Sequence, residues 1–266
     1  MRTRTILALC AAFTMSAACS DDSGGTENYT SGDTMDDGDG DPGDGDPTGD
    51  GDPTGDGDPT GDGDPGGIPI DPDNMIDNFE DGDGALIPNG GRQGYWYTFN
   101  DETEGSSQAP ASDMVLPEAG GASGTSLAMH TSGDGFTEWG AGVGVDLNNM
   151  GDPDGGNGIK MAYDASAFTG IVLRAKGSNA QIRASVQIVD TIPPEEGGTC
   201  MADCDPHGKV LLLSDEWQEF TLPFDQLNQE GWGTPAAWDA STVVGLQFKV
   251  AKDVAFDFWV DEIGFY

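Results

Sequence analysis

The sequence predicts an all-β protein, a β-sandwich of the jelly-roll type preceded by a disordered linker rich in Asp, Gly and Pro. Three observations lead to this prediction. Positions 20–73 hold 18 acidic residues, no Lys or Arg and scarcely a large apolar side chain. From about position 74 onward, short runs of β-branched and aromatic residues alternate with clusters of Gly, Asn, Asp and Pro. No long segment there has the period of an amphipathic helix.

The N-terminus has the residue order of an export signal. Arg2 and Arg4 precede an apolar run at 6–15, and small residues follow. The expected cleavage point before Cys19 resembles that of bacterial lipoproteins, in which the new N-terminal Cys carries lipid. This resemblance implies an outer-membrane lipoprotein, displayed on the cell surface and touching the membrane through its lipid alone. Ser16 stands where that family usually has Leu, so cleavage that leaves a free Cys19 stays open.

The stretch at 43–65 reads GDGDPTGDGDPTGDGDPTGDGDP, a hexapeptide repeat without large apolar residues. Alternate Asp residues at 37–41 resemble the first ligands of an EF-hand calcium loop. Such a loop needs Gly at its sixth position and Glu at its twelfth, whereas Pro42 stands at the sixth and no Glu at the twelfth. We therefore interpret the repeat as a tether, with an average span of roughly 40 Å for about 50 residues of Gly-rich chain.

The charge of the chain excludes one class of partner. Its 48 acidic residues outnumber 10 basic residues, and the formal net charge is −38. Nucleic acids and anionic lipid surfaces are bound through clustered Lys and Arg, and a strongly acidic protein repels them. We expect no nucleic-acid partner.

Nine runs in the C-terminal region have the composition of strands separated by turn residues. They are 95–100, 126–131, 141–147, 170–176, 180–189, 209–213, 216–224, 243–250 and 254–266. A single helical turn is expected at 224–227. In the runs from Gln181 and from Val243, apolar and polar residues alternate strictly, which predicts one face in the core and one polar face.

Five phrases in the C-terminal region carry a family resemblance. They are IDNFEDGD (76–83), GRQGYWYTFND (91–101), YDASAFTGIVLRAKG (163–177), EWQEFTLPFDQL (216–227) and FWVDEIGFY (258–266). In this order and spacing, the chain from 74 to 266 resembles the jelly-roll carbohydrate-binding modules of the galactose-binding-like superfamily, in particular those of family 11.

The resemblance implies noncatalytic binding of a polysaccharide on a polar sheet face, by a protein expected to be monomeric. Arg and Gln side chains hydrogen-bond sugar hydroxyls, and aromatic rings stack on the apolar faces of sugars. The ligand-binding residues expected here are Tyr97, Arg183, Gln187, Asp205, His207, Trp232 and Gln247. Further aromatic candidates, which a sandwich commonly places in its core, are Trp96, Trp139 and Trp238.

The same family has a structural calcium ion that joins the first and last strands. The matching positions are Glu80 and Asp261, whose carboxylate oxygens are the hard ligands that calcium prefers. Calcium is thus the cofactor that the resemblance implies. The alternative is that both are ordinary surface carboxylates.

The loop GGTCMADCDPHGK offers two interpretations. Cys200, Cys204 and His207, with Asp205 as a fourth ligand, have a spacing that could begin a zinc site. An oxidising compartment and the lack of a second Cys or His cluster favour a Cys200–Cys204 disulfide. Asp205 and His207 would then be rigid, exposed groups that contact the ligand or cap the loop.

The domain organisation predicted from the sequence is a signal peptide at 1–18, a disordered acidic tether at 19–73 and a carbohydrate-binding-like domain at 74–266. No catalytic motif occurs, so we expect a binding protein rather than an enzyme. Two alternatives stay open. One is a glycan-degrading hydrolase or its accessory subunit, and the other is a structural or adhesive envelope lipoprotein.

The tether interpretation makes a direct prediction. Replacing positions 43–65 by a Gly-Ser linker of equal length leaves ligand binding unchanged, because the repeat supplies only reach and solubility. Isothermal titration of both proteins with the same polysaccharide measures this. A loss of affinity in the replaced protein would assign a binding role to the repeat.

Overall fold

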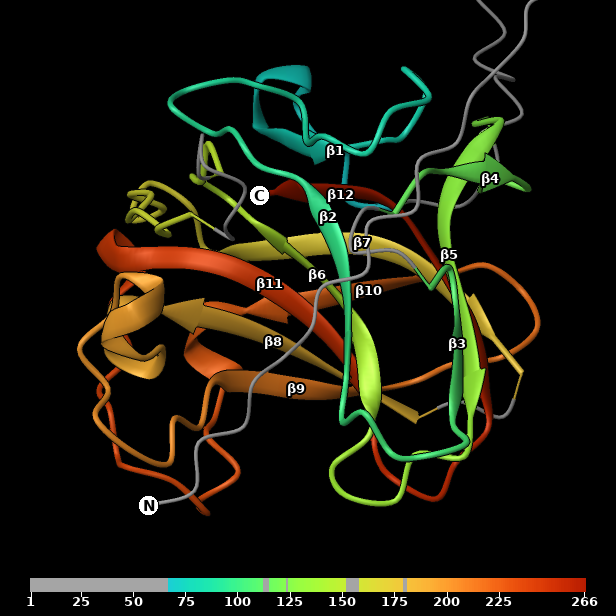
Figure 1. Ribbon diagram of the computed structural model, residues 1–266. Helices are drawn as coiled ribbons and strands as arrows, with labels where there is room; N and C mark the ends of the chain where they lie inside the picture. The colour runs from blue at the N-terminus through green and yellow to red at the C-terminus, as the bar shows by residue number, and fades with distance from the viewer. Residues whose placement is uncertain (1–66, 112–114, 123, 152–157, 179–180) are drawn as a thin grey trace, which may run out of the picture. The chain divides into compact units, whose positions relative to one another are not determined.

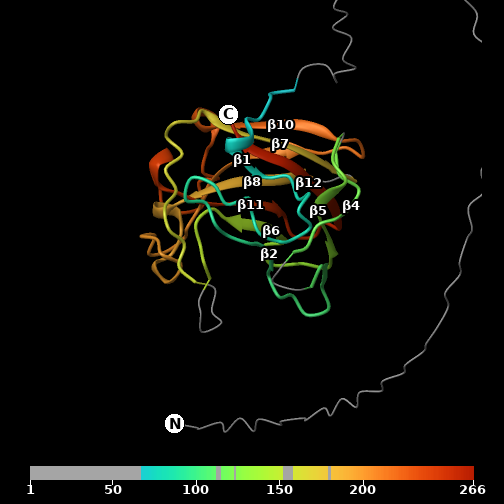
Figure 2. The same ribbon diagram turned by 90° about the horizontal axis from the view of Figure 1, so that it is seen from above.

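The protein is described by a computed structural model that covers residues 67–266 except 112–114, 123, 152–157 and 179–180. Two antiparallel β-sheets pack face to face, as Figures 1 and 2 show, which confirms the predicted all-β sandwich. The signal peptide and the hexapeptide repeat lie outside the described residues. Within the described ranges there is no α-helix, and no helix there is long and apolar enough to cross a membrane.

The larger sheet has seven strands and the smaller has five. The larger runs β10-β7-β12-β5-β3, with β1 beside β12 and β4 beside β5, and the smaller runs β2-β6-β11-β8-β9. The strands are β1 (Met75–Asp77), β2 (Trp96–Asn100), β3 (Ser107–Ala109), β4 (Glu118–Ala119), β5 (Leu127–Asp134), β6 (Ala141–Asp146), β7 (Gly170–Gly177), β8 (Gln181–Ile188), β9 (His207–Leu212), β10 (Gln218–Pro223), β11 (Val243–Val250) and β12 (Phe256–Phe265).

All nine predicted strands are present, and the predicted turn is the 3₁₀ turn Phe224–Gln226. The sequence analysis missed β1, β3 and β4, which have only two or three residues each. Alternation cannot be recognised over so few positions, and these strands form because a longer neighbour offers free backbone groups.

The alternation in β8 and β11 places one face of the smaller sheet in the core. Phe248 lies opposite Ala184 on β8 and Val143 on β6, so a large side chain faces two smaller ones. All three are fully buried or nearly so. Such alternation of large and small residues fills the space between the sheets at the density of a protein interior.

One buried hydrogen bond joins the two sheets. The indole Nε1 of Trp96, at the start of β2, donates to Asp77 Oδ2 at the end of β1, over 2.7 Å. The other oxygen of Asp77 accepts from the backbone N–H of Phe79 at 2.8 Å. Burial raises the pKa of Asp77 to about 7, because the ionised form is poorly solvated there.

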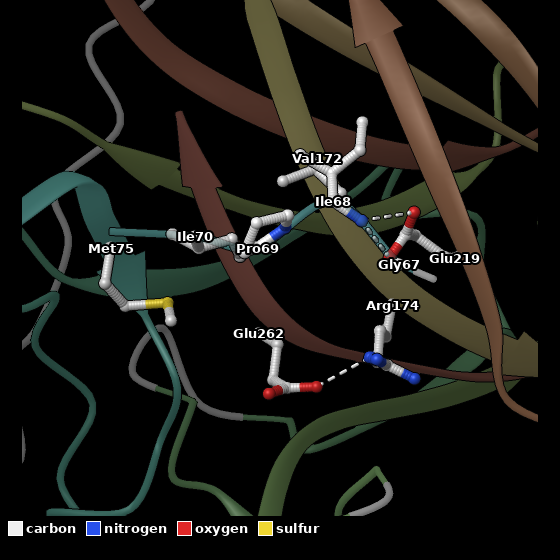
Figure 3. Close-up of a pocket in the computed structure, with 9 residues that line it drawn as sticks. All are labelled: Gly67, Ile68, Pro69, Ile70, Met75, Val172, Arg174, Glu219 and Glu262. Atoms are coloured by element: carbon white, nitrogen blue, oxygen red, sulfur yellow. Dashed lines mark hydrogen bonds and ion pairs between the residues drawn. The ribbon is translucent and has the colours of Figure 1, made fainter. Parts of the chain in front are cut away.

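The first described residues lie against the outer face of the larger sheet (Figure 3). The Ile68 N–H donates to both carboxylate oxygens of Glu219 on β10, each at 3.1 Å. Beside it, Arg174 on β7 pairs with Glu262 on β12 at 2.7 Å, and a cavity of about 210 Å³ lies under the segment. Described residues that precede the predicted domain start at 74 thus already contact the larger sheet.

The buried Asp77 predicts a dependence of stability on pH. The folded protein keeps the proton on this carboxyl at pH values at which the unfolded chain has lost it. The stability that Asp77 supplies is therefore complete below about pH 4 and is lost as the pH rises to about 7. The loss is on the order of 2 to 4 kcal/mol for a pKa shift of this size.

Urea unfolding of the Asp77→Asn variant between pH 4 and 8 measures this effect. The amide loses one acceptor, so the variant is less stable at pH 4, but its stability falls less with rising pH. Asp71→Asn, at an exposed aspartate, keeps the wild-type slope. Equal slopes in all three proteins would contradict the assignment of Asp77.

Candidate ligand-binding face

The outer surface of the smaller sheet collects most of the residues expected to bind ligand. We call it the five-stranded face and define it by Tyr97, Phe99, Gly142, Gly144, Arg183, Ser185, Val210, Gln247 and Lys249, which face away from the core. The strand register arranges them in two rows across the sheet. One row is Tyr97, Gly144, Gln247 and Ser185; the other is Phe99, Gly142, Lys249, Arg183 and Val210.

Two glycines on β6 make room for two aromatic rings on β2. A Cβ at Gly144 would lie 2.8 Å from the Tyr97 ring, and one at Gly142 would lie 2.9 Å from the Phe99 ring. Both distances are shorter than van der Waals contact, so only glycine lets these rings lie over β6. The rings therefore cover the sheet beside the polar side chains of β11.

A third aromatic ring extends this end of the face. Trp139 stacks on Phe99 with ring centroids 6.0 Å apart and stays 45 % exposed. Its loop is held by Asp101, whose Oδ2 accepts the backbone N–H groups of Glu138, Trp139 and Gly140, each at 2.9 Å. The pKa of Asp101 is lowered, since these bonds and those from Thr103 outweigh the opposing effect of desolvation.

A buried lysine neutralises the carboxylates beside Tyr97. Lys160 lies 3.2 Å from Asp146 and 2.7 Å from Glu196, and its side chain is only 10 % exposed. Burial alone would lower the pKa of Lys160, but the negative charge around it raises that pKa. Desolvation in turn raises the pKa of Tyr97 to about 12, so its hydroxyl keeps its proton and donates to Asp146 at 3.3 Å.

Arg183 and Trp232 lie together at the other end of the face. The Arg183 guanidinium donates to the carbonyls of Pro206 at 3.2 Å and Asn228 at 2.6 Å, and its Nε lies 3.6 Å from Glu230. The same Glu230 carboxylate accepts from the Trp232 indole at 3.1 Å. Trp232 is 56 % exposed, as a ligand-stacking ring must be.

The structure thus brings Tyr97, Arg183, Trp232 and Gln247 to one surface. Gln187 lies on the same side of β8 but is buried, and its side-chain oxygen accepts from Lys160 at 3.4 Å. Gln187 thus stabilises the group formed by Lys160, Asp146 and Glu196, which we call the lysine cluster. It does not offer a ligand an open hydrogen-bonding group.

The expectation that Asp205 and His207 are exposed is wrong. Asp205 is 1 % exposed, and its carboxylate accepts from the backbone of Glu230 and Gly231. His207 faces inward at the start of β9, edge-on to Trp238, and burial lowers its pKa. Both were misplaced because a short disulfide loop was expected to project from the surface, whereas a second loop packs on it.

The two cysteines form the predicted disulfide, Cys200–Cys204. Their sulfur atoms are therefore bonded to each other, and the zinc alternative is excluded. Among the described residues no group of three or more His, Cys, Asp and Glu side chains is arranged to hold a metal.

Glu80 and Asp261 anchor a turn before β5. Glu80 Oε1 accepts the N–H groups of Ser126 and Leu127 at 2.7 and 2.8 Å. Asp261, fully buried, accepts from Ala122 N at 2.8 Å and Thr125 Oγ1 at 2.6 Å. The carboxylate oxygens that face this turn thus accept hydrogen bonds from N–H and O–H groups. The positive ends of these groups would repel a cation placed beside them. Calcium at Glu80 and Asp261 stays a prediction of the resemblance.

Sequence reasoning missed Phe99, Lys160 and Glu230. Phe99 follows Tyr97 by two residues, so strict alternation would have placed both rings on one face. Lys160 and Glu230 belong to irregular segments without a periodic pattern, and nothing in the sequence indicates their contacts.

Carboxyls with raised pKa values lie away from the five-stranded face. In the described part of the chain they are Asp77, Asp261 and Glu262, each raised mainly by burial. The first two are buried, and Glu262 pairs with Arg174 on the larger sheet.

No protein-family model matches the chain. It is 25 % identical over 202 residues to Endoglucanase 3 of Fibrobacter succinogenes, which covers 71 % of this chain and 26 % of that protein. The chain thus spans about a quarter of the length of this relative.

Three similar solved structures come from Clostridium thermocellum. The family 11 module of the cellulase Lic26A-Cel5E is 17 % identical, with 75 % of this chain and 95 % of that one covered and a TM-score of 0.47. A family 11 module in complex with a β-1,3-1,4-mixed-linked tetrasaccharide is 18 % identical (72 % and 94 % covered, TM-score 0.47). The family 30 module of Cel9D-Cel44B is 12 % identical (72 % and 95 % covered, TM-score 0.49). Carbohydrate-binding modules of the family named from the sequence are therefore among the structures similar to this chain.

The lysine cluster predicts a loss of stability on mutation. Lys160→Ala leaves the buried Asp146 without its counter-ion, which lowers the free energy of unfolding by on the order of 3 kcal/mol. Urea unfolding at pH 7 measures it. The matched control Lys252→Ala, at an exposed loop position, changes stability by less than about 0.5 kcal/mol. Equal losses of stability in the two variants would show that the lysine cluster contributes nothing to the free energy of unfolding.

Proposed function

We propose that the five-stranded face binds an uncharged polysaccharide without acting on it. The observation that carries this proposal is the arrangement of two exposed tryptophans at opposite ends of the five-stranded face. Trp139 lies beside Phe99 at the β2 end, and Trp232 lies beside Arg183 at the β8 end. Polar side chains of β8 and β11 lie between them.

This arrangement suits the chemistry of a sugar chain. The faces of a pyranose ring carry C–H groups that stack on indole, while its hydroxyls hydrogen-bond to amides and cationic groups. Neighbouring strands lie about 4.8 Å apart, so the row from β2 to β8 spans roughly 14 Å. That length accommodates several linked sugar units.

The charges around the face favour a neutral ligand. Of the cations around the face, Lys160 is committed to Asp146 and Glu196, and Arg183 is held by two backbone carbonyls and Glu230, which leaves Lys249 on β11. The chain as a whole is strongly acidic and repels polyanions. The lipid anchor at Cys19 and the outer-membrane location stay predictions of the sequence.

The proposal is tested by titrating the whole chain with a panel of cellulose, β-1,3-1,4-mixed-linked glucan, agarose and starch. Trp139→Ala and Trp232→Ala each weaken binding of the preferred member by roughly tenfold, about 1.4 kcal/mol, because each removes one stacking platform. Gln247→Ala weakens it by a smaller factor.

Trp217→Ala is the matched control. This tryptophan contacts Lys176 on the larger sheet, away from the five-stranded face, so affinity is unchanged. Failure of the wild-type protein to bind any panel member would refute the proposal. An equal loss on Trp217→Ala would place the binding surface on the other sheet.

A further inference from the structure

The loop 200–206 and the segment 228–236, which carries Trp232, are packed together beside the five-stranded face. We propose that the disulfide-closed loop positions Trp232 and Arg183, with Asp205 as the main positioning residue, and so sets the affinity of that end of the face. This inference rests on the proposed function. It gives the disulfide and Asp205 an indirect role in binding, through the residues that they position.

Asp205 makes the central contacts between the loop and the segment. Its Oδ1 accepts from Glu230 N at 3.2 Å and its Oδ2 from Gly231 N at 2.7 Å, directly before Trp232. Its backbone oxygen accepts from the Gln229 amide at 2.7 Å. A buried carboxylate that accepts two adjacent N–H groups fixes the path of the backbone that supplies them.

The disulfide ring supplies a second set of contacts. Thr234 donates its backbone N–H to Asp203 O and its hydroxyl to Ala202 O, both at 2.8 Å. Both acceptors lie between Cys200 and Cys204, so the disulfide fixes the directions of their carbonyls. The segment is thus held on both sides of Trp232, through Glu230 and Gly231 before it and Thr234 after it.

The same two pieces of chain hold Arg183. One guanidinium nitrogen donates to Pro206 O from the loop and to Asn228 O from the segment. Glu230 then links the guanidinium to the Trp232 indole. A movement of the loop relative to the segment would therefore displace the indole and the guanidinium together.

The expected consequence is a change in affinity with little change in fold. The disulfide closes a short ring at a sequence separation of 4, so it constrains the unfolded chain weakly. Holding a binding group in its bound position removes the entropy cost of ordering it when ligand arrives. Loss of the disulfide or of the Asp205 carboxylate restores that cost.

The test compares the Cys200→Ser plus Cys204→Ser double variant, Asp205→Ala and Asp205→Asn with the wild-type protein. Amide hydrogen exchange over 229–236 needs no ligand and becomes at least about tenfold faster in the double variant and in Asp205→Ala. Affinity for the panel polysaccharide that the wild type prefers falls about fivefold to tenfold. Asp205→Asn keeps one acceptor, so it gives intermediate values in both measurements.

Asp164→Ala is the matched control, because it removes a comparable side-chain cap, the 3.0 Å bond to Ser166 N, at an exposed turn. It changes neither measurement. Unchanged exchange over 229–236 in the double variant and in Asp205→Ala would overturn the proposal. Faster exchange with undiminished affinity would overturn it as well. If the wild type binds no panel member, the proposed function fails, while the exchange experiment still decides whether the loop holds the segment.

Discussion

The buried hydrogen bond between Trp96 and Asp77 fixes how the first strands of the two sheets lie against each other. It joins the first strand of one sheet to the first strand of the other, and both side chains are buried. Because Trp96 points inward, alternation along β2 turns Tyr97 and Phe99 outward. The aromatic surface of the five-stranded face thus follows from a bond in the core, and the raised pKa of Asp77 reflects the cost of burying its acceptor.

The five-stranded face is built by two different physical devices at its two ends. At the β2 end, glycines on β6 let the Tyr97 and Phe99 rings lie on the sheet, and stacking on Phe99 supports Trp139. At the β8 end, no strand carries the exposed ring, and hydrogen bonds between two loops hold it. The first end is fixed by sheet packing, and the second depends on a few polar contacts that single substitutions can remove.

How far the sequence could predict this structure depends on the range of each interaction. Alternation in the runs from Gln181 and Val243 predicted their strands and the side on which Arg183 and Gln247 lie, because side-chain direction is a local property. The burial of Asp205 results from a loop about 25 residues away, and Lys160 meets Asp146 from an irregular segment. Such pairings are decided by tertiary packing, on which residue spacing carries no information.

The contact between Ile68 and Glu219 lies on the opposite side of the domain from the five-stranded face. Residues 67–70 lie on the larger sheet, whereas the proposed ligand lies on the smaller one. A force applied to a polymer bound on the smaller sheet would act on β8 and β11. The packed core between the sheets would then transmit that force to the larger sheet and its edge strand β10.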